Sequence, residues 1–186
     1  MNDNKFLNGQ LIVSQPSSQD PYFAKSVILV AQHTESGAWG VMVNRRARTV
    51  TMSNIMAVVG IEYSGNEPVF VGGPVEPTRV HVVHTLDWSS PSTLYISDNL
   101  GVTGDISILS AISNGTGPKL YKAGIGLSVW GAGQLEGEQS GLDPWNPSHR
   151  WLVTTATADV CLSGSGEEQW QRAIQSSVQQ KISDYF

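Results

Sequence analysis

The chain is organised around one stretch, GLSVWGAGQLE, which runs from Gly126 to Glu136. It begins inside the most regular strand pattern of the sequence and ends in a glycine-rich turn. Trp130, Gln134 and Glu136 stand at this turn, where small polar residues that bond back to the local backbone are more usual. Large side chains in such a place indicate contacts with other segments of the chain.

The residues before this turn alternate between apolar and small or polar types, which is typical of a half-buried strand. Glycines inside a strand weaken it and usually mark the close approach of a backbone or a ligand. The alternation predicts a strand over 121–129, with Tyr121, Ala123, Ile125, Leu127 and Val129 on one face and Lys122, Gly124, Gly126 and Ser128 on the other.

Length and composition favour one globular domain over residues 1–186. The net charge of −5 disfavours non-specific binding to nucleic acid or to an anionic membrane. Arg45, Arg46 and Arg48 form the one local basic cluster of the sequence, and we interpret them as a solvated strand edge.

The cysteine content limits both redox and metal chemistry. Cys161 is the single cysteine, so an intramolecular disulfide and a zinc site built from cysteines are both excluded. The N-terminal residues lack an apolar segment of signal-peptide length, and no apolar run is long enough for a transmembrane helix. These features predict a cytoplasmic protein.

The hydrophobic patterns predict an α+β fold, with hairpins early in the chain and helices between later strands. The last helix is the clearest, because Ser165 and Glu168 match a capping box and Trp170, Ile174, Val178 and Ile182, with Ala173, are spaced to form a buried stripe. Strands are predicted over 11–13, 26–31, 40–43, 68–71, 79–84, 93–96, 151–154 and 158–162, and helices over 51–59, 105–113 and about 166–184.

The motif at 131–137 also resembles a dinucleotide-binding fingerprint, since it is glycine-rich and follows a strand. Glu136 would repel a pyrophosphate, and Gly137, Gly141 and Pro144 leave little room for a helix. A structural turn is therefore the preferred interpretation. Ser128 does not fit a serine-hydrolase elbow either, because Trp130 stands where the second glycine is needed.

The remaining candidate groups favour structural roles. His81 and His84 are three residues apart in a predicted strand, so they should point to opposite faces. His33 and Glu35 form one pair, which is too few ligands for a metal site. Glu136 and Glu138 are expected to be exposed carboxylates, Cys161 a buried structural thiol, and His149 a packing residue.

Short segments spread along the chain form a recognisable series: 9–13 with Pro16 and Asp20, Phe23 with Ser26-Val27, His33 with 37–40 and Asn44, 71–74, His84, Ile108-Leu109, Gly117-Pro118 and 130–136. In this order, the segments resemble the YqgE/AlgH family of bacterial proteins. The departures from the family pattern are Leu127-Ser128-Val129 before the motif tryptophan, Arg46 in place of a proline, and an apparent insertion over 141–150.

The resemblance implies one domain with a branched mixed β-sheet, partly closed into a small barrel and surrounded by helices. It implies no established reaction. Some members are named as transcriptional regulators, although the family has no recognisable DNA-binding motif. The sequence of this chain supplies none.

Two functional hypotheses follow. The first is a non-enzymatic domain that binds a protein or small-molecule partner, with a regulatory role and no direct contact with nucleic acid or membrane; the oligomeric state is left open. The second is a small-ligand site or an undiscovered enzyme around Trp130, Gln134 and Glu136. Burial separates them, because convergence of these side chains on an open cleft would favour the second.

No catalytic residue, metal ligand or cofactor is assigned. The residues expected to form a ligand site or a clamp between loops are Asn44, Gly72, Gly73, Trp130, Gln134 and Glu136. We expect Gln134 and Glu136 to reach the backbone of a neighbouring glycine-rich loop, either 72–74 or 37–40.

Overall fold

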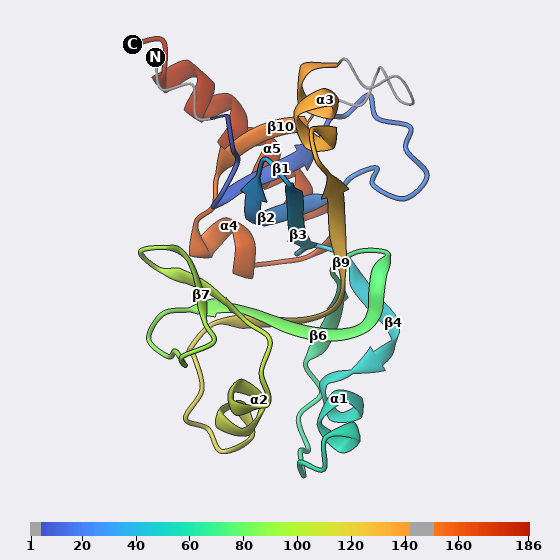
Figure 1. Ribbon diagram of the computed structural model, residues 1–186. Helices are drawn as coiled ribbons and strands as arrows, with labels where there is room; N and C mark the ends of the chain where they lie inside the picture. The colour runs from blue at the N-terminus through green and yellow to red at the C-terminus, as the bar shows by residue number, and fades with distance from the viewer. Residues whose placement is uncertain (1–4, 142–150) are drawn as a thin grey trace.

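The computed structural model describes residues 5–141 and 151–186, and it confirms an α+β fold (Figure 1). The predicted insertion over 141–150, apart from Gly141, and the predicted packing role of His149 lie outside the described residues. The elements are β1 (Gln10–Ser14), β2 (Val27–Thr34), β3 (Gly37–Met42), β4 (Arg46–Thr51), α1 (Met52–Val58), β5 (Pro68–Val71), β6 (Val75–Thr85), β7 (Leu94–Ser97), β8 (Leu100–Thr103), α2 (Ile106–Ser113), β9 (Tyr121–Gly131), α3 (Gln134–Ser140), β10 (Trp151–Thr155), α4 (Ala158–Leu162) and α5 (Gly166–Ser183).

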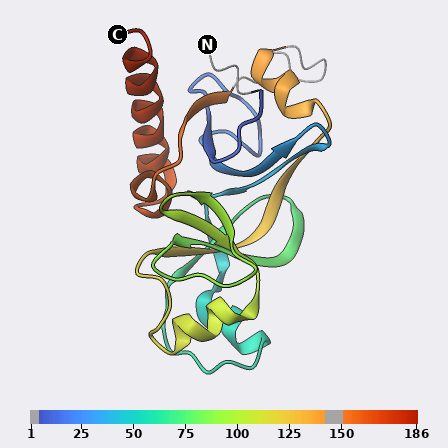
Figure 2. The same cartoon turned by 60° about the vertical axis from the view of Figure 1, so that its left-hand side comes forward.

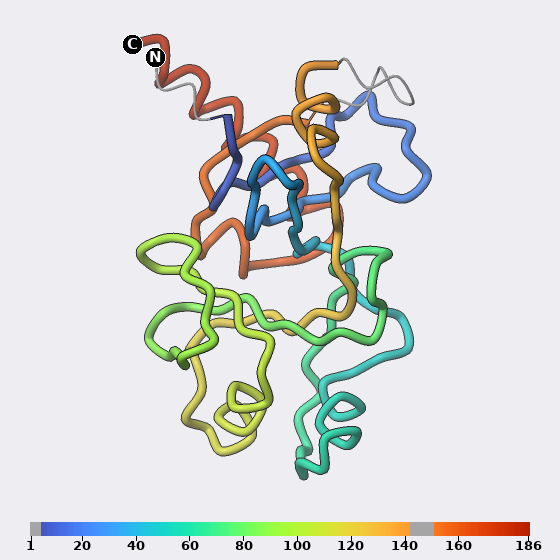
Figure 3. Tube along the Cα trace, in the orientation of Figure 1, coloured from blue at the N-terminus to red at the C-terminus, as the bar shows by residue number. Residues whose placement is uncertain are grey.

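Strand β9 joins the two halves of the molecule. The main path of the sheet runs β10-β1-β2-β3-β9-β6-β8-β7, and β5, which also pairs with β4, branches from it by lying parallel to β9. The other pairings are antiparallel, so the sheet is mixed and branched. The chain trace shows β9 rising from the half that contains α1 and α2 to the half that contains α3 (Figure 3).

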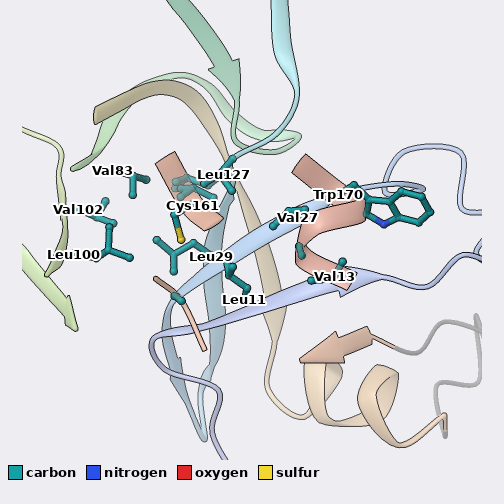
Figure 4. Close-up of a cluster of buried hydrophobic side chains, with 14 residues drawn as sticks. Leu11, Val13, Val27, Leu29, Val83, Leu100, Val102, Leu127, Cys161 and Trp170 are labelled. Carbon is teal, nitrogen blue, oxygen red and sulfur yellow. The ribbon is translucent and has the colours of Figure 1, made fainter. Parts of the chain in front are cut away.

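The largest core lies inside the curled sheet. Strands β1, β2 and β3 contribute Leu11, Leu29 and Val41 from one side, and β8 contributes Leu100. Helices α4 and α5 contribute Cys161 and Trp170 (Figure 4). Helix α5 runs along this half of the molecule, away from α1 and α2 (Figure 2). The curled sheet with its helices agrees with the expected partial barrel.

Gly126 divides the side-chain alternation of β9 into two phases, which corrects the prediction of one apolar face. Ala123 and Ile125 pack in the core beneath α1 and α2, whereas Leu127 belongs to the core inside the curled sheet. The change occurs at Gly126, which has φ +78°, a backbone conformation that favours glycine. A Cβ there would lie 2.3 Å from the Gly73 carbonyl oxygen.

Gly124 and Gly126, the two glycines inside β9, do mark close approaches, as predicted. Gly126 is approached by the Gly73 backbone, and a Cβ on Gly124 would lie 2.5 Å from Nε2 of His81. The connection between β5 and β6, and the His81 side chain from β6, can therefore lie against β9 at these two points.

The buried stripe of α5 differs from the predicted one. Trp170 is 7% exposed and its indole Nε1 donates to the Ser14 carbonyl at 2.8 Å, as a docked helix requires. Further along, Ala173 and Ser177 are buried, whereas Val178 is 48% exposed and Ile182 is exposed as well. A repeat of four residues drifts around a helix of 3.6 residues per turn, which carries these last two positions off the packed face.

Two other local predictions are wrong. Ser165 makes no side-chain capping hydrogen bond to α5, so the predicted capping box is absent at this described position. Residues 158–162 form helix α4 rather than a strand, because the Thr157 hydroxyl accepts from the Val160 N–H and caps its first turn. Among the described residues, no helix is long and apolar enough to cross a membrane.

Candidate functional site

The motif at the end of β9 forms a strand, a tight turn and a short helix. Gly133 has φ +74° at the start of α3, and this left-handed residue turns the chain from the strand into the helix. The Gln134 side chain then accepts from the Gly131 N–H at 2.9 Å and donates to Glu138 Oε1 at 3.1 Å. Gln134 therefore closes the turn that it follows.

Glu138, rather than Glu136, is the centre of this cluster. Its Oε2 accepts from the indole N–H groups of Trp130, at 2.9 Å, and Trp151, at 2.8 Å. The residue is 7% exposed, which corrects the prediction of an exposed carboxylate. A buried carboxylate needs such donors. The spacing of four residues between Gln134 and Glu138 on a helix was the signal available in the sequence.

Glu136 faces the buried ring of His33. Its Oε2 lies 3.1 Å from His33 Nε2, an ion-pair distance, although the alignment is not that of a well-formed hydrogen bond. His33 Nδ1 accepts from the Leu7 N–H at 3.1 Å, so the ring proton is on Nε2 and points at the carboxylate. The partner is therefore a side chain, and neither of the glycine-rich loops predicted for it.

The pKa of Glu136 lies below its usual range for several competing reasons. Burial of the carboxyl would raise the pKa, but the backbone N–H of Glu136 and the His33 ring together outweigh that effect, with a contribution from Lys5. Because both nitrogens of His33 are engaged and the ring is buried, the pair ties β2 and the N-terminal segment to α3.

Asn44 is a clamp between segments, at a place separate from the motif. Its Oδ1 accepts from the Val27 N–H at 2.9 Å, and its Nδ2 donates to the carbonyls of Lys25 at 2.8 Å and Gly166 at 3.0 Å. The amide thereby joins the start of β2 to the start of α5. All of these contacts are internal, so the geometry describes a structural tie.

Gly72 and Gly73 lie where β5 meets β9. A Cβ on Gly72 would be 2.3 Å from the Gly126 carbonyl oxygen, and one on Gly73 would be 2.1 Å from the carbonyl carbon of Leu127. The Ser128 hydroxyl donates to the Gly72 carbonyl at 3.0 Å. Backbone atoms fill the space beside these two glycines. The predicted site residues therefore lie in three separate places: the motif at the end of β9, Asn44, and the Gly72-Gly73 pair.

Lys122 is a buried lysine that the sequence pattern placed on a small or polar face of the strand. Its ammonium donates to the carbonyls of Val43 at 2.7 Å and Gly164 at 2.8 Å, and to Gln169 Oε1 at 2.7 Å. Burial lowers its pKa to about 7. Burial likewise raises the pKa of the Cys161 thiol to about 12, which makes that thiol a poor nucleophile. Three acceptors for three N–H groups indicate a structural role for the lysine.

A groove of about 490 Å³ opens beside β9, and we call it the His81 groove. Strands β3, β6, β7, β8 and β9 all contribute to it, at a place where the curled sheet leaves its core accessible. Its lining consists of apolar Trp39, Val75, Leu94, Val102, Leu127 and Val129, polar or charged Glu76, Arg79, His81 and Ser92, and Gly104.

His81 is a buried histidine in the lining of this groove. The residue is 4% exposed, and its Nδ1 is buried with no partner among the described residues. Burial, assisted by the charge of Arg79, lowers the pKa of His81 to about 4, so the ring is neutral near pH 7. An unpaired buried polar atom is costly, and such exceptions call for an explanation.

The rim of the groove departs from regular strand geometry. The register between β6 and β9 shifts between Val75 and Val80, and Glu76 has φ +47°, a strained conformation for this residue. Its carboxylate pairs with Arg79 Nη1 at 2.9 Å. Bulges and strained residues of this kind occur frequently next to binding sites. The sequence offered no sign of this groove beyond the presence of His81.

The fold and the groove together define an α+β domain with a curled, branched sheet and a recess of ligand size. A model of the AlgH-like family matches residues 11–181, and the chain belongs to that family. A UPF0301 protein of Sphingopyxis alaskensis is 33% identical, covering 91% of this chain and 88% of that protein. Another UPF0301 protein, from Xanthomonas campestris, is 35% identical, covering 90% of this chain and 87% of that protein.

Two solved structures resemble the fold. AlgH from Pseudomonas aeruginosa superposes with a TM-score of 0.75 and 26% identity, covering 95% of this chain and 91% of that one. Protein DIP2367 from Corynebacterium diphtheriae gives a TM-score of 0.73 at 22% identity, covering 94% and 89%, and supports the fold alone.

Proposed function

We propose that this protein is a non-enzymatic binding domain that holds a partner molecule in the His81 groove and has a regulatory role without direct contact with DNA. The observation that carries the proposal is a groove of ligand size whose lining includes His81, a residue whose buried Nδ1 has no hydrogen-bond partner within the described parts of the chain. Binding sites are concave and mostly apolar, with a few polar groups that fix orientation, and the mouth of a barrel is a common place for them.

The alternative site around the motif has less support. Trp130, Gln134 and Glu136 have their polar groups engaged with Glu138, the Gly131 backbone and His33. These contacts hold α3 against the sheet. By the burial criterion, they favour a structural motif over an open ligand site or an enzyme centre.

The regulatory part of the proposal rests on the resemblance to members named as transcriptional regulators. The net charge of −5 favours action through a bound molecule rather than through DNA contact. A domain that changes its binding properties when the groove fills would meet this description.

A fragment screen followed by NMR tests the groove. In spectra of uniformly ¹⁵N-labelled protein, we expect fragments to perturb the amides of Val75, Gly104 and Val129. Val129→Asp should weaken these responses, because it places a charge on the apolar wall. Val178→Asp is a matched control, since both residues are 48% exposed and Val178 lies on α5.

Binding in the groove and binding at the motif would perturb different sets of backbone amides. Fragments that perturb Gln134 and Glu136 instead of the groove would favour the alternative site. A screen without groove responses, or responses that survive Val129→Asp unchanged, would contradict the proposed function.

A further inference from the structure

The His81 groove combines an apolar wall with two nitrogen groups, and this combination indicates the class of its ligand. Trp39, Leu127 and Val129 provide aromatic and aliphatic surface. Arg79 and His81 line the same groove. A ligand that uses both kinds of contact must be apolar over most of its length and polar at one end.

Arg79 already holds a carboxylate, that of Glu76, at 2.9 Å. The guanidinium has five N–H groups, and planar pairing with a carboxylate is its preferred geometry. Both side chains of this ion pair are more than half exposed, so their interaction contributes little to stability. A ligand carboxylate can therefore replace Glu76 on Arg79, and Glu76 would then be free to leave its strained backbone conformation.

His81 favours the same chemistry. Arg79 is close enough to lower the pKa of His81, so a cationic ligand would meet an existing positive charge. The neutral imidazole adds a polar group to the lining beside the guanidinium, and a carboxylate held on Arg79 would be an anion close to it. A simple alcohol offers no charge to Arg79.

We propose that the His81 groove binds an apolar monocarboxylate, with the tail against Trp39, Leu127 and Val129 and with the carboxylate exchanging with Glu76 on Arg79. This inference rests on the proposed function, because it names the ligand class of the same groove. Straight-chain and aromatic acids both fit this description.

Calorimetric titration with octanoate and with octan-1-ol tests the inference on the full chain. The two probes share the tail length and differ in the charged end. We expect octanoate to bind at least about tenfold more tightly, as a charge-assisted pair predicts. Octanoate should also raise the pKa of His81, because a nearby anion stabilises the imidazolium; ¹⁵N NMR of the histidine rings measures this shift.

Two variants separate the contributions of the head and the tail. Arg79→Gln should remove the preference for octanoate and leave octan-1-ol binding unchanged. The fold should be retained in this variant, because the side chain of Arg79 is 61% exposed. Val129→Asp should weaken the binding of both octanoate and octan-1-ol, whereas Val178→Asp should change neither. Thermal melts confirm that each variant is folded, and chemical-shift mapping on the unmodified chain locates both probes independently of any variant.

The outcomes distinguish the two proposals. If octan-1-ol binds in the groove as tightly as octanoate, the carboxylate class is wrong and the proposed function stands. If octanoate keeps its preference in Arg79→Gln, the assigned head-group contact is wrong. If neither probe perturbs the groove, both the ligand class and this use of the groove are overturned.

Discussion

At the scale of single residues, Glu138 carries the most consequential contacts of the motif. Glu138→Ala removes the acceptor of the buried Trp130 indole and of the Gln134 amide. We expect a loss of about 2–4 kcal/mol in the free energy of unfolding, because buried donors are left unpaired. Glu138→Gln keeps one oxygen and should cost less. Urea denaturation measures both changes.

Glu35→Ala is the control for this substitution, since Glu35 is exposed in the turn between β2 and β3. Its effect should remain within about 0.5 kcal/mol. Equal denaturation midpoints for Glu138→Ala and Glu35→Ala would show that the cluster around Glu138 does not hold α3 to the sheet.

Residue types identified the motif but not the role of each side chain. Glu136 and Glu138 look alike in the sequence, yet one faces a histidine and the other two indoles. Lys122 looked like a residue of the polar strand face and is buried under three acceptors. These roles depend on partners far away along the chain, so local periodicity could not reveal them.

At the scale of elements, the docking of α5 depends on Trp170. Trp170→Ala should lower the free energy of unfolding by about 3–5 kcal/mol, because it empties a large buried volume and leaves the Ser14 carbonyl without its indole donor. Ile182→Ala, on the exposed side of the same helix, should change it by less than about 0.5 kcal/mol. A thermal melt of Trp170→Ala that matches the parent protein would contradict this packing.

The positions of most helices and strands could be predicted from the sequence. The face to which each side chain points was harder to predict. Strands with continuous apolar runs, such as β2, and helices with clear periodicity, such as α2, lie close to their expected positions. Residues 158–162 were misassigned because a short apolar run fits a strand or a helix equally well, and a capping threonine decided the outcome. In β9, the left-handed Gly126 separates Ala123 and Ile125, which pack in one core, from Leu127, which packs in the other.

At the scale of the whole molecule, the branched sheet was expected only from the family resemblance. Strand β9 pairs with β3, β5 and β6, all of which lie far from it in the sequence, and periodicity does not specify such partners. The His81 groove has the same origin, since five strands converge to form it. A site assembled from distant segments is visible only once the topology is known.

The charge distribution of the whole molecule predicts no intrinsic affinity for DNA. The net charge is −5, and the basic cluster is small: Arg45 packs over the ring of Tyr22 at 5.1 Å, while Arg46 and Arg48 are exposed on β4. Affinity for DNA depends on neutralising several phosphates and falls steeply with salt. In gel-shift titrations near physiological ionic strength, we expect no complex at sub-micromolar protein.

Replacing Arg45, Arg46 and Arg48 together with glutamine supplies the control for that titration. The triple variant should behave like the parent protein, because neither carries a phosphate-binding surface of sufficient size. A sub-micromolar complex that weakens with added salt and disappears in the triple variant would instead identify β4 as a DNA contact. Regulation through the His81 groove would then have to be reconsidered as regulation at the nucleic acid itself.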